Sequence, residues 1–194
     1  QDVHEPGNIV AKTFDEASDA LSYDLWALVQ NGPIEQLNQT EYTQPALLSA
    51  SIALWRLASQ TTLPEIAVVA GHSLGEYSAL VAAEVISFVD AVKLVQKRGQ
   101  FMQTAVPLGE GGMAAILGLD DVQVVELCKA VSAEGGVVQA ANFNATGQVV
   151  IAGDNAALER AMNACKSAGA KRVMPLAVSA PFHSTLMQPA AEKL

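Results

Sequence analysis

The 194-residue sequence is poor in basic residues and in cysteine. Lysine and arginine number 11 against 20 acidic residues, so the net charge is −9, and no basic cluster offsets it. Such a chain repels phosphate backbones, which argues against nucleic-acid binding. Cys128 and Cys165 form no C-x-x-C motif and fall in helical patterns. We therefore expect two buried thiols rather than a disulfide or a catalytic cysteine.

Long apolar runs are also missing. No run reaches about 18 residues, so the sequence predicts no membrane-spanning segment and no membrane partner. The first residues, QDVHEPGN, lack the positive region and apolar core of a signal peptide, which predicts a cytoplasmic location. A hydrophobic content of 51% with 16% charged residues predicts a well-filled globular core, in one domain or in a larger domain that carries a small one.

The most informative stretch is residues 66–83, IAVVAGHSLGEYSALVAA. Residues 66–70 are continuously apolar, as in a strand buried on both faces, and helix formers follow residue 75. Between them stands Gly71-His72-Ser73-Leu74-Gly75. G-x-S-x-G between strand and helix is the pattern of a nucleophile elbow, although the bare pattern also arises by chance in loops. Both glycines are predicted to prevent Cβ clashes, and the backbone N–H of the residue after the serine is a candidate oxyanion donor.

Alternating α/β order is predicted around this motif. Helices are expected over residues 9–21, 23–29 and 43–59, the last with Pro45 in its first turn, and it leads into the elbow strand. Residues 87–90 have the spacing of a capping box and open a further helix that runs to about residue 102. Helix, strand, nucleophile turn and helix together indicate an α/β core.

Arg98 occupies an unusual position in that further helix, because it lies on the same face as Leu94 and Val95. A buried guanidinium requires a partner. One interpretation is a structural ion pair with an acidic residue elsewhere in the chain. The other is that Arg98 binds a carboxylate of the substrate through two parallel hydrogen bonds. The helical pattern does not choose between them.

A second domain is predicted after the glycine cluster at residues 109–112, which reads as a linker. We expect strands at residues 113–117, 137–142, 148–152 and 171–178, and helices at residues 120–133 and 155–168. The order βαββαβ is ferredoxin-like. The predicted domains are therefore residues 1–108 as part of the core, residues 109–178 as the ferredoxin-like subdomain, and residues 179–194 as a return to the core.

The sequence contains three histidines that could act as the general base for the serine. His4 lies in an irregular start, and His72 is too close to Ser73 in the chain to reach its hydroxyl in line, although it could shape a pocket. His183 lies in a proline-containing turn, on the kind of loop that carries function. It is either a solvated side chain or the base. Neither Asp154 nor Glu159 is expected to complete a triad, since both are predicted to be solvated.

These residues together resemble those of the malonyl-CoA:acyl carrier protein transacylases, which load malonyl groups for bacterial fatty acid synthesis. The resemblance rests on residues 71–80, Arg98, the Asn142-Phe143-Asn144 turn and residues 178–183, and it extends over nearly the whole chain. It implies a hydrolase-like α/β core with a nucleophile elbow and a small ferredoxin-like subdomain.

The resemblance also implies the roles of individual residues. Ser73 would be the nucleophile, His183 the general base and acid, the N–H of Leu74 an oxyanion donor, and Arg98 the residue that binds the malonyl carboxylate. Weaker pocket candidates are His72, Asn144 and Phe182, and the last would suit a small substituent on the malonyl C2 carbon. The reaction would pass through a malonyl-serine and transfer malonyl to the phosphopantetheine thiol of acyl carrier protein. Coenzyme A thioester enters as a substrate, with no cofactor and no metal.

The chain also departs from that family. Members begin with a strand and a Gly-Gln-Gly-Ser-Gln loop that completes the oxyanion hole, and they continue well past the position of Leu194. We therefore expect a piece of a longer protein, truncated at both ends, and a molecule limited to this piece would be inactive. The competing hypotheses are an esterase-type serine hydrolase and a non-catalytic module that docks a carrier protein.

Overall fold

The computed structural model describes Glu5 and residues 7–107, 109–178 and 180–194. His4, one of the three histidines, and Ser179, in the stretch before His183, lie outside the described residues. Contacts divide the chain into two compact units, Gln1–Gln100 and Phe101–Leu194, and each is considered by itself. The domain boundaries expected near residues 108 and 178 stay a prediction.

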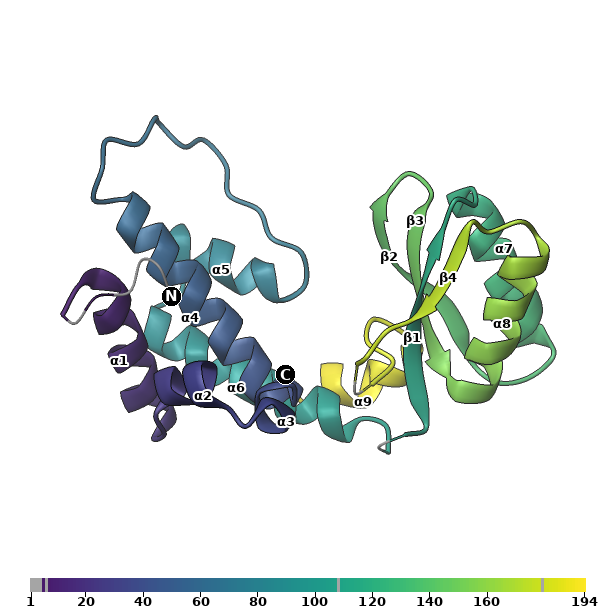
Figure 1. Ribbon diagram of the computed structural model, residues 1–194, viewed down its shortest axis with the longest axis horizontal. Coiled ribbons are helices and arrows are strands. Elements are labelled where there is room, and N and C mark those ends of the chain that lie inside the picture. The colour runs from purple at the N-terminus through teal and green to yellow at the C-terminus, as the bar shows by residue number, and fades with distance from the viewer. Residues whose placement is uncertain (1–4, 6, 108, 179) are drawn as a thin grey trace. The chain divides into compact units, whose positions relative to one another are not determined.

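The described part of the first unit is helical (Figure 1). Its helices are α1 Ile9–Leu21, α2 Leu25–Asn31, α3 Ile34–Leu37, α4 Thr40–Ala58, α5 Leu74–Ala82 and α6 Phe88–Thr104, the last of which continues past the end of the unit. The prediction for α1 is confirmed at both ends. The short α3 was not predicted. α4 begins at Thr40 rather than at residue 43, so Pro45 lies in its second turn. A proline there removes one backbone hydrogen bond, and the buried face that it shares with Ala46 and Leu48 offsets this loss.

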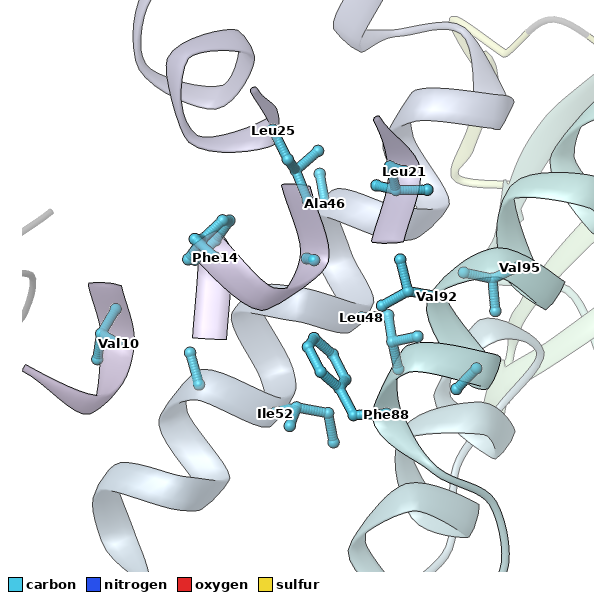
Figure 2. Packing of buried hydrophobic residues seen from close by; sticks show 13 residues of the cluster. Val10, Phe14, Leu21, Leu25, Ala46, Leu48, Ile52, Phe88, Val92 and Val95 are labelled. Carbon is cyan, nitrogen blue, oxygen red and sulfur yellow. The ribbon is translucent and has the colours of Figure 1, made fainter. Parts of the chain in front are cut away.

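A single hydrophobic cluster joins α1, α4 and α6 (Figure 2). Residues of α1 spaced three and four apart form one face, which packs against Leu48 and Ile52 of α4 and against Phe88 and Val92 of α6. Each such side chain contributes about 1.5–3 kcal/mol when fully buried. The labelled residues in Figure 2 are Val10, Phe14, Leu21, Leu25, Ala46, Leu48, Ile52, Phe88, Val92 and Val95.

Side-chain caps mark where several helices begin. The carboxamide of Asn8 caps α1, and the carboxylate of Asp24 caps α2. At α6, the N–H of Asp90 donates to Ser87 Oγ at 3.1 Å, and Ser87 Oγ donates to Asp90 Oδ2 at 2.6 Å. The predicted capping by Ser87 is thus confirmed. The side chain of Asp90 accepts from the Ser87 hydroxyl, whereas in a capping box it would accept from the backbone N–H of residue 87. A cap of this kind stabilises a helix by about 1 kcal/mol.

The segment between α4 and α5 differs from the sequence prediction. Residues 66–70 were expected to form a buried strand, but they carry no strand pairing, and Val68 is 79% exposed. Figure 1 shows this segment as part of a long connection. A strand exists only where neighbouring backbone satisfies its N–H and C=O groups, and no described strand lies beside residues 66–70. Apolar character alone therefore does not make this segment a strand.

The second unit contains an antiparallel four-stranded sheet in the order β2-β3-β1-β4. Its elements are β1 Gly111–Leu117, α7 Asp121–Ala133, β2 Val138–Ala145, β3 Gln148–Asp154, α8 Asn155–Ser167 and β4 Arg172–Pro175, followed by the 3₁₀ turn η1 Thr185–Met187 and α9 Gln188–Ala191. The βαββαβ order is the one predicted. β4 ends earlier than expected, at Pro175, which has no N–H to donate to the ladder.

Two layers of apolar side chains cover this sheet. On one face, Ile116 and Ile151 pack with residues of α7 and α8, which lie on that side in Figure 1. Cys128 and Cys165 belong to this layer, and both are free and buried, as predicted. Burial raises the pKa of Cys128 to about 12 and also raises the pKa of Cys165. On the other face, Phe182 packs against a cluster that contains Met113, Val150 and Ala152.

Candidate active site

The turn that carries Ser73 is sharp and strained. Ser73 has φ 54° and ψ −111°, a left-handed conformation that is uncommon for a residue other than glycine. A Cβ at Gly71 would lie 1.9 Å from the backbone C and O atoms of Gly75, so only glycine fits at position 71. A Cβ at Gly75 would meet no atom within 4 Å among the described residues. The predicted need for glycine is therefore confirmed at Gly71 and is wrong at Gly75. The reason is that a Cβ at position 71 would point toward the backbone of α5, whereas a Cβ at position 75 would point away from the other described atoms.

Ser73 precedes the first residue of α5, yet its side chain does not cap that helix. Its Oγ instead accepts a hydrogen bond from Arg98 Nη2 at 3.0 Å. Leu74 is the first residue of α5, where N–H groups have no acceptor within the helix and the helix dipole is positive. This position suits the predicted oxyanion donor. The side chain of His72 is exposed beside the turn.

Arg98 is half-buried on α6 and is held by neutral groups. Its Nη1 donates to Gln44 Oε1 at 2.6 Å, and its guanidinium lies 5.7 Å from the ring centroid of Tyr77. Burial lowers the pKa of Arg98, and Tyr77 acts in the opposite direction, while an arginine remains charged throughout the physiological range. The ion pairs within the described residues join Arg56 to Glu16 and Lys129 to Glu126. The structural ion pair considered for Arg98 therefore has no partner in the described part of the chain.

Gln44 is the residue of this site that the sequence reasoning missed. Its side chain is 5% exposed, it bonds to Arg98, and it comes from α4, 54 residues earlier in the chain. A signal for it exists in the sequence. Gln44, Leu48 and Ile52 follow one another at a spacing of four, so a polar residue stands on a helix face that is otherwise apolar. Buried polar groups are hydrogen-bonded, which makes such a residue a candidate for a specific contact.

His183 belongs to the second unit and sits on a short turn. Its φ is 61°, again left-handed, and its side chain is exposed. Ser184 Oγ donates to the carbonyl of Pro181 at 2.7 Å, and the N–H of Thr185 donates to Gln139 Oε1 at 2.7 Å. The first bond spans the histidine and the second fixes the chain two residues after it, so together they hold the strained turn.

The remaining candidates lie elsewhere in the second unit. Phe182 is half-buried against the sheet, so it anchors the turn that presents His183. Asn144 is exposed near the end of β2, beside the connection to β3. Glu159 is exposed, as predicted.

The prediction that Asp154 is solvated is wrong. Asp154 is half-buried, and its carboxylate accepts hydrogen bonds from the N–H of Val137 at 2.5 Å and from the N–H of Ala157 at 2.9 Å, which caps α8. Although partial desolvation acts to raise it, the pKa of Asp154 is lowered by these bonds to the charged form. Its role is structural, because both bonds are to backbone groups at the start of an element.

Within the first unit, the fold brings Ser73, Leu74, Arg98 and Gln44 together. Within the second unit, it brings His183 next to Phe182. No group of three or more His, Cys, Asp or Glu side chains in the described ranges could hold a metal ion. A strained serine at a helix N-terminus, beside an arginine without a carboxylate partner in those ranges, is equipped to attack a carbonyl compound that carries a negative charge.

The chain belongs to the acyl transferase domain family, which it matches over residues 9–194. The matched residues include the Ser73 turn and extend over both units described above.

Among proteins that carry a name, the chain is similar to the malonyl CoA-acyl carrier protein transacylase of Salmonella typhimurium. The two are 63% identical over 186 residues, which are 96% of this chain and 60% of that protein. The predicted resemblance is therefore confirmed. The chain spans about 60% of the length of the curated relatives it matches.

Solved structures support the same relationship. The transacylase structure from Coxiella burnetii is 54% identical with a TM-score of 0.93, over 95% of this chain and 58% of that one. A malonyl-transacylase solved in complex with its type II PKS acyl-carrier protein is 57% identical with a TM-score of 0.93, over 95% of this chain and 60% of that one. None of the helices in the described part of this chain has the length and apolar character needed to cross a bilayer.

Proposed function

We propose that the protein containing this chain transfers a malonyl group from coenzyme A to the phosphopantetheine thiol of acyl carrier protein. The observation that carries the proposal is Arg98, whose charge has no carboxylate partner in the described ranges and whose guanidinium contacts Ser73 Oγ. A site of this kind suits an acyl group that ends in a carboxylate. The names of the relatives support the same substrate.

In the first half-reaction, His183 accepts the proton of Ser73, and Oγ attacks the thioester carbonyl. The oxyanion forms against the N–H of Leu74. The C–S bond then breaks, the coenzyme A sulfur takes the proton from His183, and malonyl-serine remains. This step requires His183 to come within hydrogen-bond reach of Ser73 Oγ.

In the second half-reaction, the phosphopantetheine thiol gives its proton to His183 and attacks the malonyl-serine. The C–O bond breaks, and Ser73 recovers its proton from His183. Because the acyl group waits on the enzyme between two thiols, the kinetics are ping-pong.

Selectivity for malonyl over acetyl follows from Arg98. A hydrogen bond between charged groups contributes about 1.5–3 kcal/mol, which corresponds to roughly 10- to 150-fold in rate or affinity. Acetyl has no carboxylate, so it leaves that interaction unmade. Phe182 beside His183 suits a small substituent on the malonyl C2 carbon. The cytoplasmic location predicted from the sequence belongs to the same proposal, together with malonyl-CoA and acyl carrier protein as partners.

Mass spectrometry of the intact natural protein tests the proposal. Incubation with malonyl-CoA is expected to add the mass of one malonyl group on Ser73, and acyl carrier protein is expected to remove it. The Ser73→Ala variant is expected to add none. Rapid turnover of p-nitrophenyl esters that does not depend on Arg98 would instead favour an esterase. A biological role retained by Ser73→Ala would favour a docking module.

A further inference from the structure

A chain of hydrogen bonds leads from the first turn of α4 to Arg98. Gln44 Nε2 donates to Thr40 Oγ1 at 2.9 Å, and Gln44 Oε1 accepts from Arg98 Nη1 at 2.6 Å. Thr40 is 8% exposed and Gln44 is 5% exposed, so the bond between them is buried, while the bond to the half-buried Arg98 is partly buried. Because arginine only donates hydrogen bonds, the amide must present its oxygen to Arg98 and its nitrogen to Thr40.

The amide oxygen orients Arg98 without neutralising it. A carboxylate is the usual partner of a shielded guanidinium, and it would cancel the charge. Glu41 lies where α4 touches α6, and its Oε2 accepts from Gln100 Nε2 at 3.1 Å. No ion pair within the described residues includes Arg98. The site therefore holds an arginine in place and leaves its positive charge available.

Close approach of the two helices makes this contact possible. Gly99 follows Arg98 on α6, and a Cβ there would lie 2.5 Å from the Cα of Glu41 and 2.6 Å from the carbonyl oxygen of Thr40. Glycine thus lets α6 touch the first turn of α4, and Gln44, one turn further along α4, bonds to Arg98. Of these α4 residues, Gln44 bonds to the guanidinium directly, and Thr40 acts on it only through Gln44.

We propose that Gln44 is a positioning residue for substrate selection: it orients Arg98 for the carboxylate of the acyl group while leaving the charge uncompensated, and Thr40 holds Gln44 in that role. The inference rests on the proposed function, because it concerns how Arg98 recognises malonyl. Because Gln44 is neutral, the positive charge of Arg98 stays available to bind the substrate carboxylate.

The decisive variant is Gln44→Glu, which places a carboxylate next to Arg98 with little change in size. The substrate carboxylate then has to displace an ion pair. We expect the KM for malonyl-CoA to rise about tenfold or more, because that is the factor that corresponds to the free energy of one charge-assisted hydrogen bond. Slow acyl transfer from acetyl-CoA, which makes no use of Arg98, is expected to stay within about twofold. The ratio of kcat/KM for malonyl-CoA to that for acetyl-CoA therefore falls about tenfold.

Two further variants and one control sharpen the test. Gln44→Met removes the acceptor without adding charge, and Thr40→Val removes the group that holds Gln44. Both are expected to lower the malonyl-to-acetyl ratio by about three- to tenfold, less than Gln44→Glu does. Gln39→Glu makes the same charge change on the exposed residue just before α4, where its side chain caps nothing. It is expected to leave the ratio unchanged.

The outcomes separate this inference from the proposed function. If the unaltered natural protein takes up no malonyl on Ser73, the proposed function fails. If it takes up malonyl and prefers it to acetyl, while Gln44→Glu and Gln44→Met keep the same preference, Gln44 is not a positioning residue. An equal loss with both thioesters would indicate a purely structural role and would also overturn the inference. Should Gln44→Glu not fold, as judged by thermal unfolding, the ratios of Gln44→Met and Thr40→Val decide by the same criterion.

Discussion

The two glycines of the serine turn should respond to the same substitution with opposite signs. In Gly71→Ala, the new Cβ would lie 1.9 Å from the backbone C and O of Gly75 and 2.5 Å from the N of Glu76. Carbon atoms in contact normally stay about 3.5–4.0 Å apart. In Gly75→Ala, the new Cβ would meet nothing within 4 Å among the described residues.

The expected magnitudes follow from what has to move. Overpacking costs about 1–3 kcal/mol where side chains can shift. At Gly71 the obstacles are backbone atoms in the first turn of α5, which cannot shift as side chains do, so we expect a loss of about 3 kcal/mol in the free energy of unfolding. Gly75 is the second residue of α5, where alanine is a better helix former than glycine. That change is expected to stabilise the protein by up to about 1 kcal/mol.

Chemical denaturation of the natural protein measures both effects. Unfolding is followed by circular dichroism in urea, and the midpoint and slope give the free energy of unfolding for each variant. The two variants are expected to differ by about 3–4 kcal/mol, the sum of the two opposite effects. Malonyl loading of Gly71→Ala should also fall by about 100-fold, because the displaced turn misplaces the Ser73 hydroxyl.

A neutral Gly71→Ala, or a Gly75→Ala that loses as much stability as Gly71→Ala, would refute this reasoning. Either result would mean that the tight approach across the turn does not limit the stability of the protein. Comparable slopes in the two unfolding curves are needed for the comparison, since a changed slope would report a change in the unfolded or native state instead.

Three further predictions follow from the described contacts. Gly99→Ala should push α6 away from Glu41 and lower the malonyl-to-acetyl ratio, measured by steady-state kinetics, about tenfold. Asp154→Asn should cost about 1 kcal/mol at neutral pH, because the two backbone N–H groups would then donate to a neutral acceptor instead of a charged one. Because the folded-state pKa of Asp154 is lowered, that difference should persist above about pH 4 and vanish as the pH falls through the folded-state value, as urea unfolding at several pH values would show. Cys128 and Cys165, whose thiol pKa values are raised by burial, should resist iodoacetamide in the native protein and react in denaturant, as mass spectrometry would show.

Local features of the fold could be predicted from the sequence. The apolar spacing of residues 9–21 matches both ends of α1, and Ser87 caps α6 as its spacing with Asp90 indicated. The βαββαβ order was also predictable, because each element in it has its own periodicity and its own turn residues. The site residues implied by the resemblance stay proposals, although the contact between Arg98 and Ser73 supports two of them.

Contacts between distant residues could not be predicted in the same way. The bond between Arg98 and Gln44 joins positions 54 residues apart, and although each stands on an apolar helix face, the periodicity of neither helix indicates that the two meet. The same limit applies to residues 66–70. Their apolar character predicts a strand, but strand pairing depends on backbone supplied by other segments, and no described segment supplies it.

The sequence by itself determined the order of most helices and strands, and which serine stands in a sharp turn, because these depend on the conformational preferences of neighbouring residues. The tertiary structure alone decided that Gly71 and not Gly75 is sterically required, and that the partner of Arg98 is a neutral amide rather than an acid. Both depend on atoms that only folding brings within a few ångströms of each other.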